Sequence, residues 1–183
     1  MKKLVTLAIV VVVALVAVLV VGLRHASAHL AHGATAPPFT LEAAKGGDVA
    51  TVDLKAALAK GPVVLYFFPK SFTKGCTVEA HLFSEHIADF AKLGAQVIGV
   101  SGDDIETQKK FSTEACRSAF LVASDPGLKV AKLYDASLAP GYANRTSYVI
   151  APDGTIAYAY TNLDPEKHVD NTLDALRALA AKK

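Results

Sequence analysis

Residues 63–80 read VVLYFFPKSFTKGCTVEA, and this stretch decides the fold. Its first six residues are a continuous run of β-branched and aromatic side chains, which is typical of a strand buried on both faces. Pro69 ends that run. Residues 77–92 then carry apolar side chains at helical spacing, and Gly94 closes this predicted helix. A buried strand, a short loop and a helix in this order indicate an α/β protein.

The chain after this unit continues to alternate strand and helix patterns. Strands are predicted at residues 95–100 and 119–123, and helices at residues 104–115 and 127–134. Such alternation predicts a sheet that has strands in its centre and helices against its faces.

The C-terminal part is predicted to be a hairpin followed by a helix. The runs 146–150 and 155–160 flank Pro152-Asp153-Gly154, a turn signal that makes them an antiparallel hairpin. Pro165 opens a final amphipathic helix, whose apolar face carries Val169, Leu173, Leu176 and Leu179. Together the elements predict an α/β sandwich with a central mixed sheet covered by helices.

The N-terminus carries a long apolar run. Lys2 and Lys3 precede the segment Leu4–Leu23, which contains no charged residue. A helix of this length spans about 30 Å, the hydrocarbon thickness of a bilayer, which favours a membrane anchor. Ala26-Ser27-Ala28 has the small-residue pattern of a signal-peptidase site, so a signal peptide cleaved near Ala28 is the alternative.

Both alternatives export the rest of the chain, because the positive lysines stay in the cytoplasm. We expect a signal anchor or signal peptide at residues 1–28, a flexible linker at 29–36 and the folded domain at 37–183. The domain is then periplasmic or on the outer face of the inner membrane, held there through residues 4–23 if the segment is not cleaved.

The charge balance excludes one class of partner. The formal net charge is +2, but leaving out the N-terminal Lys2, Lys3 and Arg24 reduces 19 basic residues to 16 against 17 acidic ones, a net charge of −1. No basic patch or tail is present in the sequence to neutralise phosphates, so nucleic acid is not an expected partner.

Cysteine occurs only twice, at Cys76 and Cys116, which is too few for a disulfide framework. Cys76 follows Gly75 at the end of the loop and begins the predicted helix. Free backbone N–H groups and the positive end of the helix dipole favour a thiolate there, and the thiolate is the reactive form. A buried structural cysteine is the common alternative, but its place at a loop tip argues against it.

The loop matches a known motif. Pro69, Thr73 and Cys76 fit the Pro-x-x-x-Thr-x-x-Cys motif of peroxiredoxins, and residues 66–80 resemble the bacterioferritin-comigratory (Q-type) branch of these thiol peroxidases. The resemblance extends over about 120 residues through APPFTL (36–41), VIGVSGD (97–103) and NRTSYVIAPDG (144–154). It implies a thioredoxin-like fold and a thiol-dependent peroxidase that needs no metal, haem or flavin.

The resemblance also implies roles around Cys76. The Thr73 hydroxyl contacts the peroxide, and it is also placed to cap the helix. Pro69 shapes the pocket and shields the thiolate from water. The Arg145 guanidinium lies beside Cys76 and bonds the peroxide, while Glu79 orients Arg145 by a charge-assisted bond. Such a site holds both peroxide oxygens in line and stabilises the charge that develops when their bond breaks.

The expected product is a sulfenic acid at Cys76, which condenses with a second thiol. Many Q-type proteins place that thiol five residues after the first, but here the position is His81. Cys116, near the end of the predicted helix 104–115, is therefore the candidate resolving residue. Bridged Cα atoms lie about 4.4–6.8 Å apart, so an intramolecular disulfide requires local unwinding. If Cys116 only packs in the core, an external thiol resolves Cys76.

Two other functions stay open. An exported thiol-disulfide oxidoreductase of the same fold normally needs Cys-x-x-Cys, and Thr73 occupies the first of those positions. A copper carrier would use Cys76 with His81 or His86, but five residues turn a helix by about 500°, so Cys76 and His81 do not share a face. For the peroxidase we expect hydrogen peroxide or organic hydroperoxides as substrate, a thioredoxin-like electron donor and a monomer.

Overall fold

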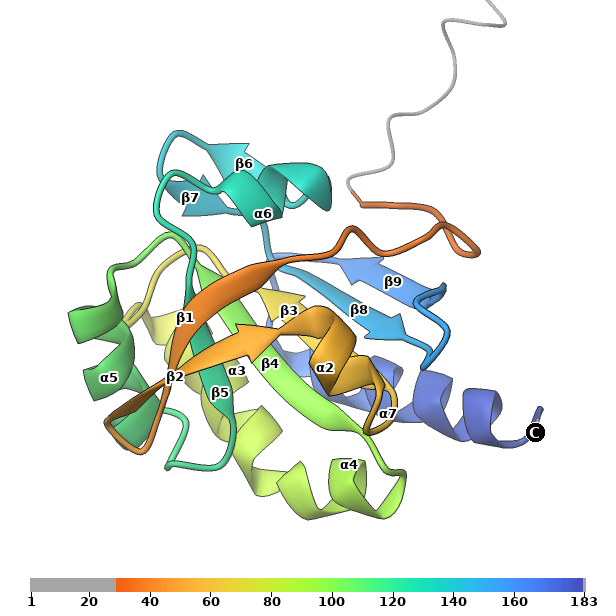
Figure 1. The fold of residues 1–183 in the computed structure, drawn as a ribbon. Coiled ribbons are helices and arrows are strands. Elements are labelled where there is room, and N and C mark those ends of the chain that lie inside the picture. The colour runs from red at the N-terminus through yellow and green to blue at the C-terminus, as the bar shows by residue number, and fades with distance from the viewer. Residues whose placement is uncertain (1–28, 183) are drawn as a thin grey trace, which may run out of the picture.

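A computed structural model describes residues 29–182 (Figure 1). The predicted anchor or signal peptide at residues 1–28 lies outside the described residues. Within residues 29–182, no helix has both the length and the apolar character needed to cross a membrane.

Within this range seven strands form one central sheet, in the order β2-β1-β5-β4-β3-β8-β9. Strands β3, β4 and β5 are parallel, and antiparallel β1 and β8 extend the sheet on either side, so the predicted mixed sheet is confirmed. A separate two-stranded sheet joins β6 and β7. The strands are β1 Thr40–Lys45, β2 Asp48–Asp53, β3 Val63–Phe67, β4 Gln96–Ser101, β5 Leu121–Ser124, β6 Ser137–Ala139, β7 Tyr142–Ala143, β8 Thr146–Ile150 and β9 Ile156–Thr161.

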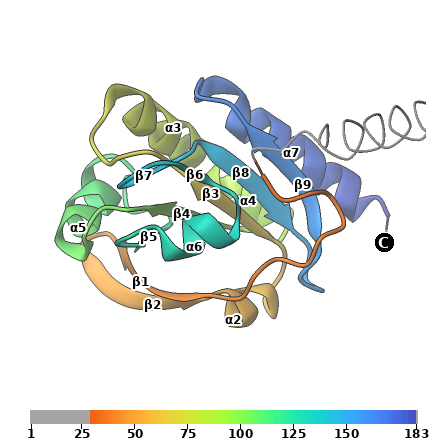
Figure 2. The ribbon, with the colours of Figure 1, turned by 90° about the horizontal axis from the view of Figure 1, so that it is seen from above.

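Helices lie on both faces of the sheet (Figures 1 and 2). Helices α3, α4, α5 and α7 contribute to one apolar core, and α2 and α6 contribute to the other. The helices are α2 Leu54–Leu58, α3 Lys74–Glu85, α4 Ile87–Lys92, α5 Ile105–Glu114, α6 Lys129–Leu133 and α7 Glu166–Ala180.

Strand β3 separates the two cores. Its five residues are all fully buried, and successive side chains point to opposite faces of the sheet. Val63, Leu65 and Phe67 pack into the core under α2 and α6. Val64 and Tyr66 pack into the core under α3 and α7. The continuous apolar run seen in the sequence is therefore required, because neither face of this strand meets water.

The helix predicted at residues 77–92 differs from the structure in two ways. It begins earlier, at Lys74, and it breaks at His86 into α3 and α4. The hydroxyl of Ser84 donates to the carbonyl of His81 at 2.7 Å, a local side-chain bond of the kind that bends helices. The apolar spacing continues across the break, so hydrophobic periodicity alone does not detect it.

Residues 29–36, expected as a flexible linker, lie along β9 as an ordered segment. The amide of Gly33 donates to the carbonyl of Ile156, and the amide of Ile156 donates to the carbonyl of Ala34, both at 2.8 Å. Thr35 forms an antiparallel bridge with Thr155. The small residues of this segment allow its backbone to approach the hairpin closely. A run of small and polar residues is also typical of a linker, so the sequence did not indicate this pairing.

Candidate active site

Cys76 is the third residue of α3 and is only 1% exposed. The loop before it leaves the carboxyl end of β3 and turns at Phe72, whose φ of 64° lies in the left-handed region. The Phe72 ring meets Phe111 of α5 edge-on, with 5.3 Å between ring centroids. This contact helps to offset the unfavourable backbone conformation of Phe72.

A buried polar network holds the same loop against β4 and α5. The amide of Ser71 donates to Asp103 at 2.7 Å, and its hydroxyl donates to Gln108 Oε1 at 3.2 Å. Gln108, itself fully buried, donates onward to the hydroxyl of Ser101 and the carbonyl of Ala123. Every polar atom of the Gln108 amide is thus engaged, so the network rigidifies the loop that carries Cys76.

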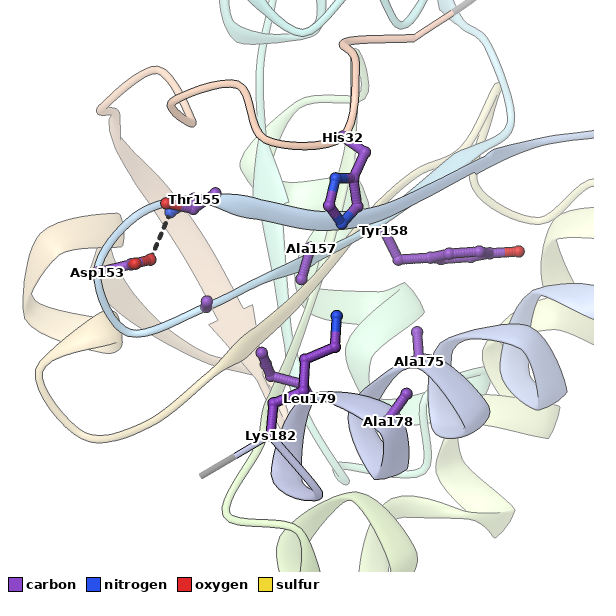
Figure 3. Close-up of a pocket in the computed structure, with 10 residues that line it drawn as sticks. His32, Asp153, Thr155, Ala157, Tyr158, Ala175, Ala178, Leu179 and Lys182 are labelled. Atoms are coloured by element: carbon purple, nitrogen blue, oxygen red, sulfur yellow. Dashed lines mark hydrogen bonds between the residues drawn. The ribbon is translucent and has the colours of Figure 1, made fainter.

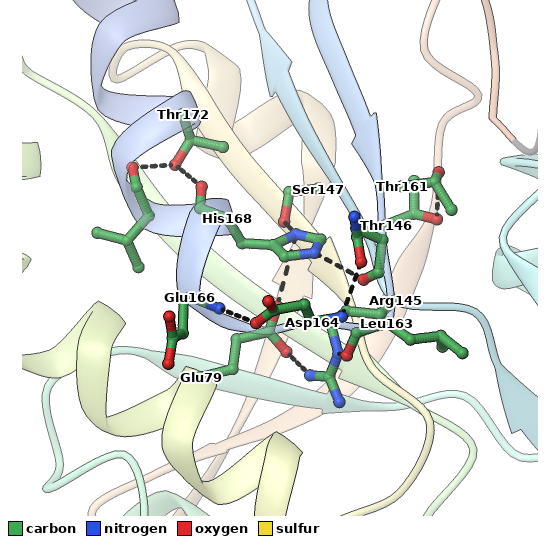
Figure 4. Close-up of polar contacts among 12 residues, drawn as sticks. Glu79, Arg145, Thr146, Ser147, Thr161, Leu163, Asp164, Glu166, His168 and Thr172 are labelled. Carbon is green, nitrogen blue, oxygen red and sulfur yellow. Dashed lines mark hydrogen bonds and ion pairs between the residues drawn. The ribbon is translucent and has the colours of Figure 1, made fainter.

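Arg145 immediately precedes β8 and reaches Cys76 from there. Strand β8 pairs with β3 in a register that places Thr146 opposite Phe67, so Arg145 lies at the end of β3 from which the Cys76 loop departs. One guanidinium nitrogen, Nη2, is 3.4 Å from Cys76 Sγ. Nη1 donates to Glu79, and Nε donates to the carbonyl of Leu163 at 2.9 Å (Figure 4). Because Cys76, Glu79 and Leu163 each bind a different nitrogen, they hold the guanidinium in one orientation.

Gly75 permits this approach. A Cβ atom at position 75 would lie 3.0 Å from Arg145 Nη2, so a larger residue would displace the guanidinium. Burial opposes the charge of Arg145, but Glu79 and Cys76 outweigh it and raise the pKa of Arg145. The guanidinium therefore stays charged beside the sulfur.

Glu79 lies one turn after Cys76 and is fully buried. Its Oε2 accepts a hydrogen bond from Arg145 Nη1. Burial raises the pKa of Glu79 to about 8, although Arg145 acts in the opposite direction. The other oxygen, Oε1, makes no hydrogen bond.

Thr73 and Pro69 flank Cys76 on the loop. Thr73 occupies the N-cap position of α3, but the predicted side-chain cap is absent. Its hydroxyl donates to the carbonyl of Lys70 at 3.0 Å instead, on an exposed part of the loop. The hydroxyl oxygen thus keeps acceptor capacity for a ligand that carries a proton. Pro69 is partly buried and lies two residues after the end of β3.

Comparison with known proteins agrees with this geometry. Residues 32–159 match the AhpC/TSA family. The chain belongs to the AhpC/TSA family. It is 37% identical over 155 residues to the chloroplastic peroxiredoxin Q of Sedum lineare, which covers 83% of this chain and 81% of that protein. It is 39% identical over 150 residues to the peroxiredoxin Q of Oryza sativa subsp. japonica, covering 80% of this chain and 67% of that protein.

Solved structures of this family give the same picture. The crystal structure of peroxidoxin BcpB from Mycobacterium tuberculosis superposes with a TM-score of 0.73 at 31% identity, covering 82% of this chain and 99% of that one. The predicted family and the thioredoxin-like fold are therefore confirmed.

Cys116, the second thiol of this AhpC/TSA domain, directly follows α5 and is fully buried. Both cysteines are free, and both belong to the core under α3 and α7. Burial raises the pKa of the Cys116 thiol well above its usual range, so in this conformation it is protonated. The next two residues, Arg117 and Ser118, both have left-handed backbones, with φ of 51° and 57°.

His168 is the polar residue of the site that sequence reasoning missed. It lies on α7, is fully buried and has Nδ1 3.6 Å from Glu79 Oε1. His168 is four residues before Thr172, and both lie on the inward side of α7. This helical spacing was the only signal in the sequence that His168 is buried. Within residues 29–182, no group of three or more His, Cys, Asp or Glu side chains is placed to hold a metal ion.

A hollow elsewhere on the domain contains none of these reactive groups. It lies between β9 and the C-terminal half of α7 (Figure 3), and small apolar side chains such as Ala157 and Ala178 line it. Lys182 and Asp153 stand at its rim.

Proposed function

We propose that this protein, a peroxidase by its family, reduces hydrogen peroxide and organic hydroperoxides at Cys76. The observation that carries the assignment is the charged Arg145 guanidinium, with Nη2 3.4 Å from a Cys76 sulfur that is almost excluded from water. A fixed cation beside a sulfur favours the thiolate, which is the nucleophile that peroxide chemistry requires.

The first step is attack of the Cys76 thiolate on one peroxide oxygen. An S–O bond forms, the O–O bond breaks, and the other oxygen leaves as hydroxide or alkoxide, which takes a proton from water. The sulfur is oxidised by two electrons to a sulfenic acid and the peroxide is reduced. Arg145, held by Glu79 and Leu163, donates to the oxygen that gains charge, because its donors do not need to reorient.

Two loop residues support this step in the proposal. The Thr73 oxygen accepts a hydrogen bond from the peroxide, while the hydroxyl hydrogen stays bonded to the carbonyl of Lys70. Pro69 offers no backbone N–H and limits the access of water beside the sulfur.

Cys116 is proposed as the resolving residue. Its thiolate attacks the sulfenic sulfur of Cys76, an S–S bond forms, and the S–OH bond breaks to release hydroxide, which is protonated to water. Burial keeps the Cys116 thiol protonated, so this step needs the segment after α5 to open. The consecutive left-handed residues Arg117 and Ser118 lower the cost of such opening, because they release strain when they leave this conformation.

A dithiol of thioredoxin-like chemistry then supplies two electrons and two protons to return both thiols. We further propose that the domain is exported by the N-terminal segment, works in the periplasm or on the outer face of the inner membrane, and acts as a monomer. The donor must then be available on that side of the membrane.

Intact mass under non-reducing conditions tests this function. The protein, Cys76→Ser and Cys116→Ala are each treated with one equivalent of hydrogen peroxide. Alanine is used at position 116 because a buried serine hydroxyl without a partner destabilises the core. Loss of two hydrogens in the parent, with one or more added oxygens at Cys76 in Cys116→Ala, supports the full proposal. Added oxygen at Cys76 of the parent without a disulfide leaves a peroxidase that uses an external thiol.

A Cys76 that stays a free thiol would refute the peroxidase mechanism. Copper uptake by the same samples would then be measured, because the carrier alternative uses Cys76 with His81 or His86. His86 already pairs with Asp89 at 3.1 Å, which competes with that role.

A further inference from the structure

A buried polar cluster adjoins Arg145 through Glu79. It consists of Glu79 from α3, His168 from α7, Ser147 from β8 and the backbone carbonyl of Asn162 (Figure 4). The side chains of Glu79, His168 and Ser147 are all fully buried. The peroxidase mechanism above uses Glu79 to hold Arg145 but gives no role to the others.

The hydrogen bonds determine where protons sit on His168. Its Nε2 is 2.9 Å from the carbonyl of Asn162, which only accepts, so Nε2 carries a hydrogen. In the neutral ring Nδ1 is then an acceptor, and the Ser147 hydroxyl donates to it at 2.7 Å. Glu79 Oε1, which has no hydrogen bond, faces this same nitrogen at 3.6 Å. With Glu79 ionised, two buried acceptors would face each other.

The net charge of the buried groups also favours an additional proton in the cluster. A Cys76 thiolate, the Arg145 guanidinium and a Glu79 carboxylate sum to one uncompensated negative charge in the core. A buried net charge is costly, so the protein gains by holding one more proton there. The contact between Glu79 Oε1 and His168 Nδ1 is where that proton satisfies an otherwise unpaired atom.

We propose that His168 is a positioning residue of the peroxidase site, which shares one proton with Glu79 and thereby keeps the Arg145 charge available to the Cys76 thiolate. Without that proton, the Glu79 carboxylate would draw Arg145 away from the sulfur and repel the thiolate. The inference rests on the proposed peroxidase function, because it concerns the same thiolate.

The other groups around the pair agree with a proton held mainly by Glu79. The pair faces Cys76 of α3, Arg145 just before β8 and the neutral phenol of Tyr66 on β3. It also meets the ring of Tyr160 on β9 and Asp164, which lies just before α7. Burial raises the pKa of Glu79 to about 8 and lowers the pKa of His168 to about 4, where Asp164 only partly opposes the effect. At neutral pH Glu79 therefore holds the proton, and its Oε1 faces Nδ1, the acceptor that the Ser147 hydroxyl also uses.

The first test needs no turnover. Carboxyl ¹³C signals of glutamate are followed through a pH titration of the whole protein, and Glu79→Gln identifies the Glu79 signal. We expect Glu79 to lose its proton above pH 7 in the parent and at lower pH in His168→Asn, whose amide donates to Oε1 and stabilises the carboxylate. A Glu79 signal that is already ionised at pH 6 in the parent overturns the shared proton, whether or not the protein is a peroxidase.

The second test measures the rate constant of Cys76 oxidation by hydrogen peroxide against pH, by quenched flow and intact mass, because the chain has no Trp to report the reaction. We expect His168→Asn to shift the ascending limb of this pH profile to higher pH by about one unit. At pH values below the limb, the rate constant of Cys76 oxidation then falls roughly tenfold. In a Glu79→Gln background, itself slower, the same replacement leaves the limb where it is. The control His86→Asn, on the surface of the same domain, leaves the parent limb unmoved.

The outcomes separate the two claims. A parent whose Cys76 does not react refutes the proposed function, and the titration of Glu79 still decides whether the proton exists. A reactive parent whose limb is not moved by His168→Asn, or is moved equally in both backgrounds, overturns only the role of His168. Ser147→Ala covers the case in which His168→Asn fails to fold. Without the Ser147 hydroxyl, Nδ1 is free to accept from protonated Glu79, which stabilises the proton on the pair. The ascending limb of the pH profile should then move to lower pH, and any other result counts against the proposal.

Discussion

The proton assigned to Glu79 has a consequence for stability that can be calculated. The perturbation is Glu79→Gln, and the quantity is the difference in unfolding free energy between parent and variant as pH rises. The usual pKa of a glutamate is 4.5, and burial raises it to about 8 in the folded protein. Between these values the folded state binds one more proton than the unfolded state, so stability falls as pH rises.

The magnitude follows from the linkage relation. One extra proton corresponds to about 1.36 kcal/mol per pH unit. From pH 5 to pH 7.5, which lies within the window, the parent should therefore lose about 3 kcal/mol relative to Glu79→Gln. The loss is complete only above the folded pKa of about 8, and below pH 4.5 the two proteins should differ by a constant.

Urea unfolding followed by far-ultraviolet circular dichroism measures this difference at each pH. Taking the difference removes the groups that do not interact with Glu79, such as the surface histidines, because they are common to both proteins. A difference that stays flat from pH 5 to 7.5 would refute the reasoning, because Glu79 would then be ionised in the folded protein. If Arg145 lowered the pKa of Glu79 below 4.5, the difference would also be flat in this window and would change only below about pH 5, where the parent would lose stability as pH falls.

Three further predictions concern the loop and the second thiol. Gly75→Ala should slow Cys76 oxidation at least tenfold in quenched-flow kinetics, because its Cβ would lie 3.0 Å from Arg145 Nη2, while the unfolding free energy stays equal or rises by up to about 1 kcal/mol. Gln108→Leu should lower the unfolding free energy by about 3 kcal/mol in urea, because Ser71, Ser101 and the Ala123 carbonyl lose a buried partner; a loss under 1 kcal/mol would contradict the network. Cys116→Ala should turn over slowly with a dithiol donor and accumulate the sulfinic form of Cys76 under excess peroxide, seen as a gain of two oxygens by mass; normal turnover would show that Cys116 is not the resolving thiol.

The sequence predicted the elements whose apolar pattern is strong. Strand β3, strand β4, the hairpin β8–β9 and helix α7 were found because their buried faces leave a clear periodicity. Strand β2 was missed because four of its six residues are exposed. Helix α2 was missed because it has only five residues, and its start depends on a single bond from the amide of Ala56 to Asp53. Short elements of this kind are stabilised by tertiary contacts that periodicity does not show.

The candidate site divides in the same way. Cys76, Thr73 and Pro69 are close in sequence, so a local motif identified them. Arg145 and Glu79 are 66 residues apart and were paired only through the family resemblance, and the structure brings them together. The capping bond expected of Thr73 is absent because its hydroxyl donates backwards to Lys70. His168 could not be assigned, since its role depends on how α7 packs against α3.

The register of two neighbouring strands explains why these residues meet. In the pairing of β3 with β8, Thr146 lies opposite Phe67 and Ser147 lies opposite Tyr66. Paired residues point to the same face, so Ser147 shares the face of Tyr66, which packs under α3 and α7. Arg145, one residue earlier in the chain, then stands at the end of β3 where the Cys76 loop begins.

A one-residue slip in this register would turn Ser147 to the opposite core and move Arg145 away from the loop. The fully buried sequence of β8 resists such a slip, because both of its faces are packed. This one strand pairing therefore brings Arg145 and Ser147 to the end of β3 where the Cys76 loop begins, and the packing of α3 and α7 in the same core adds Glu79 and His168.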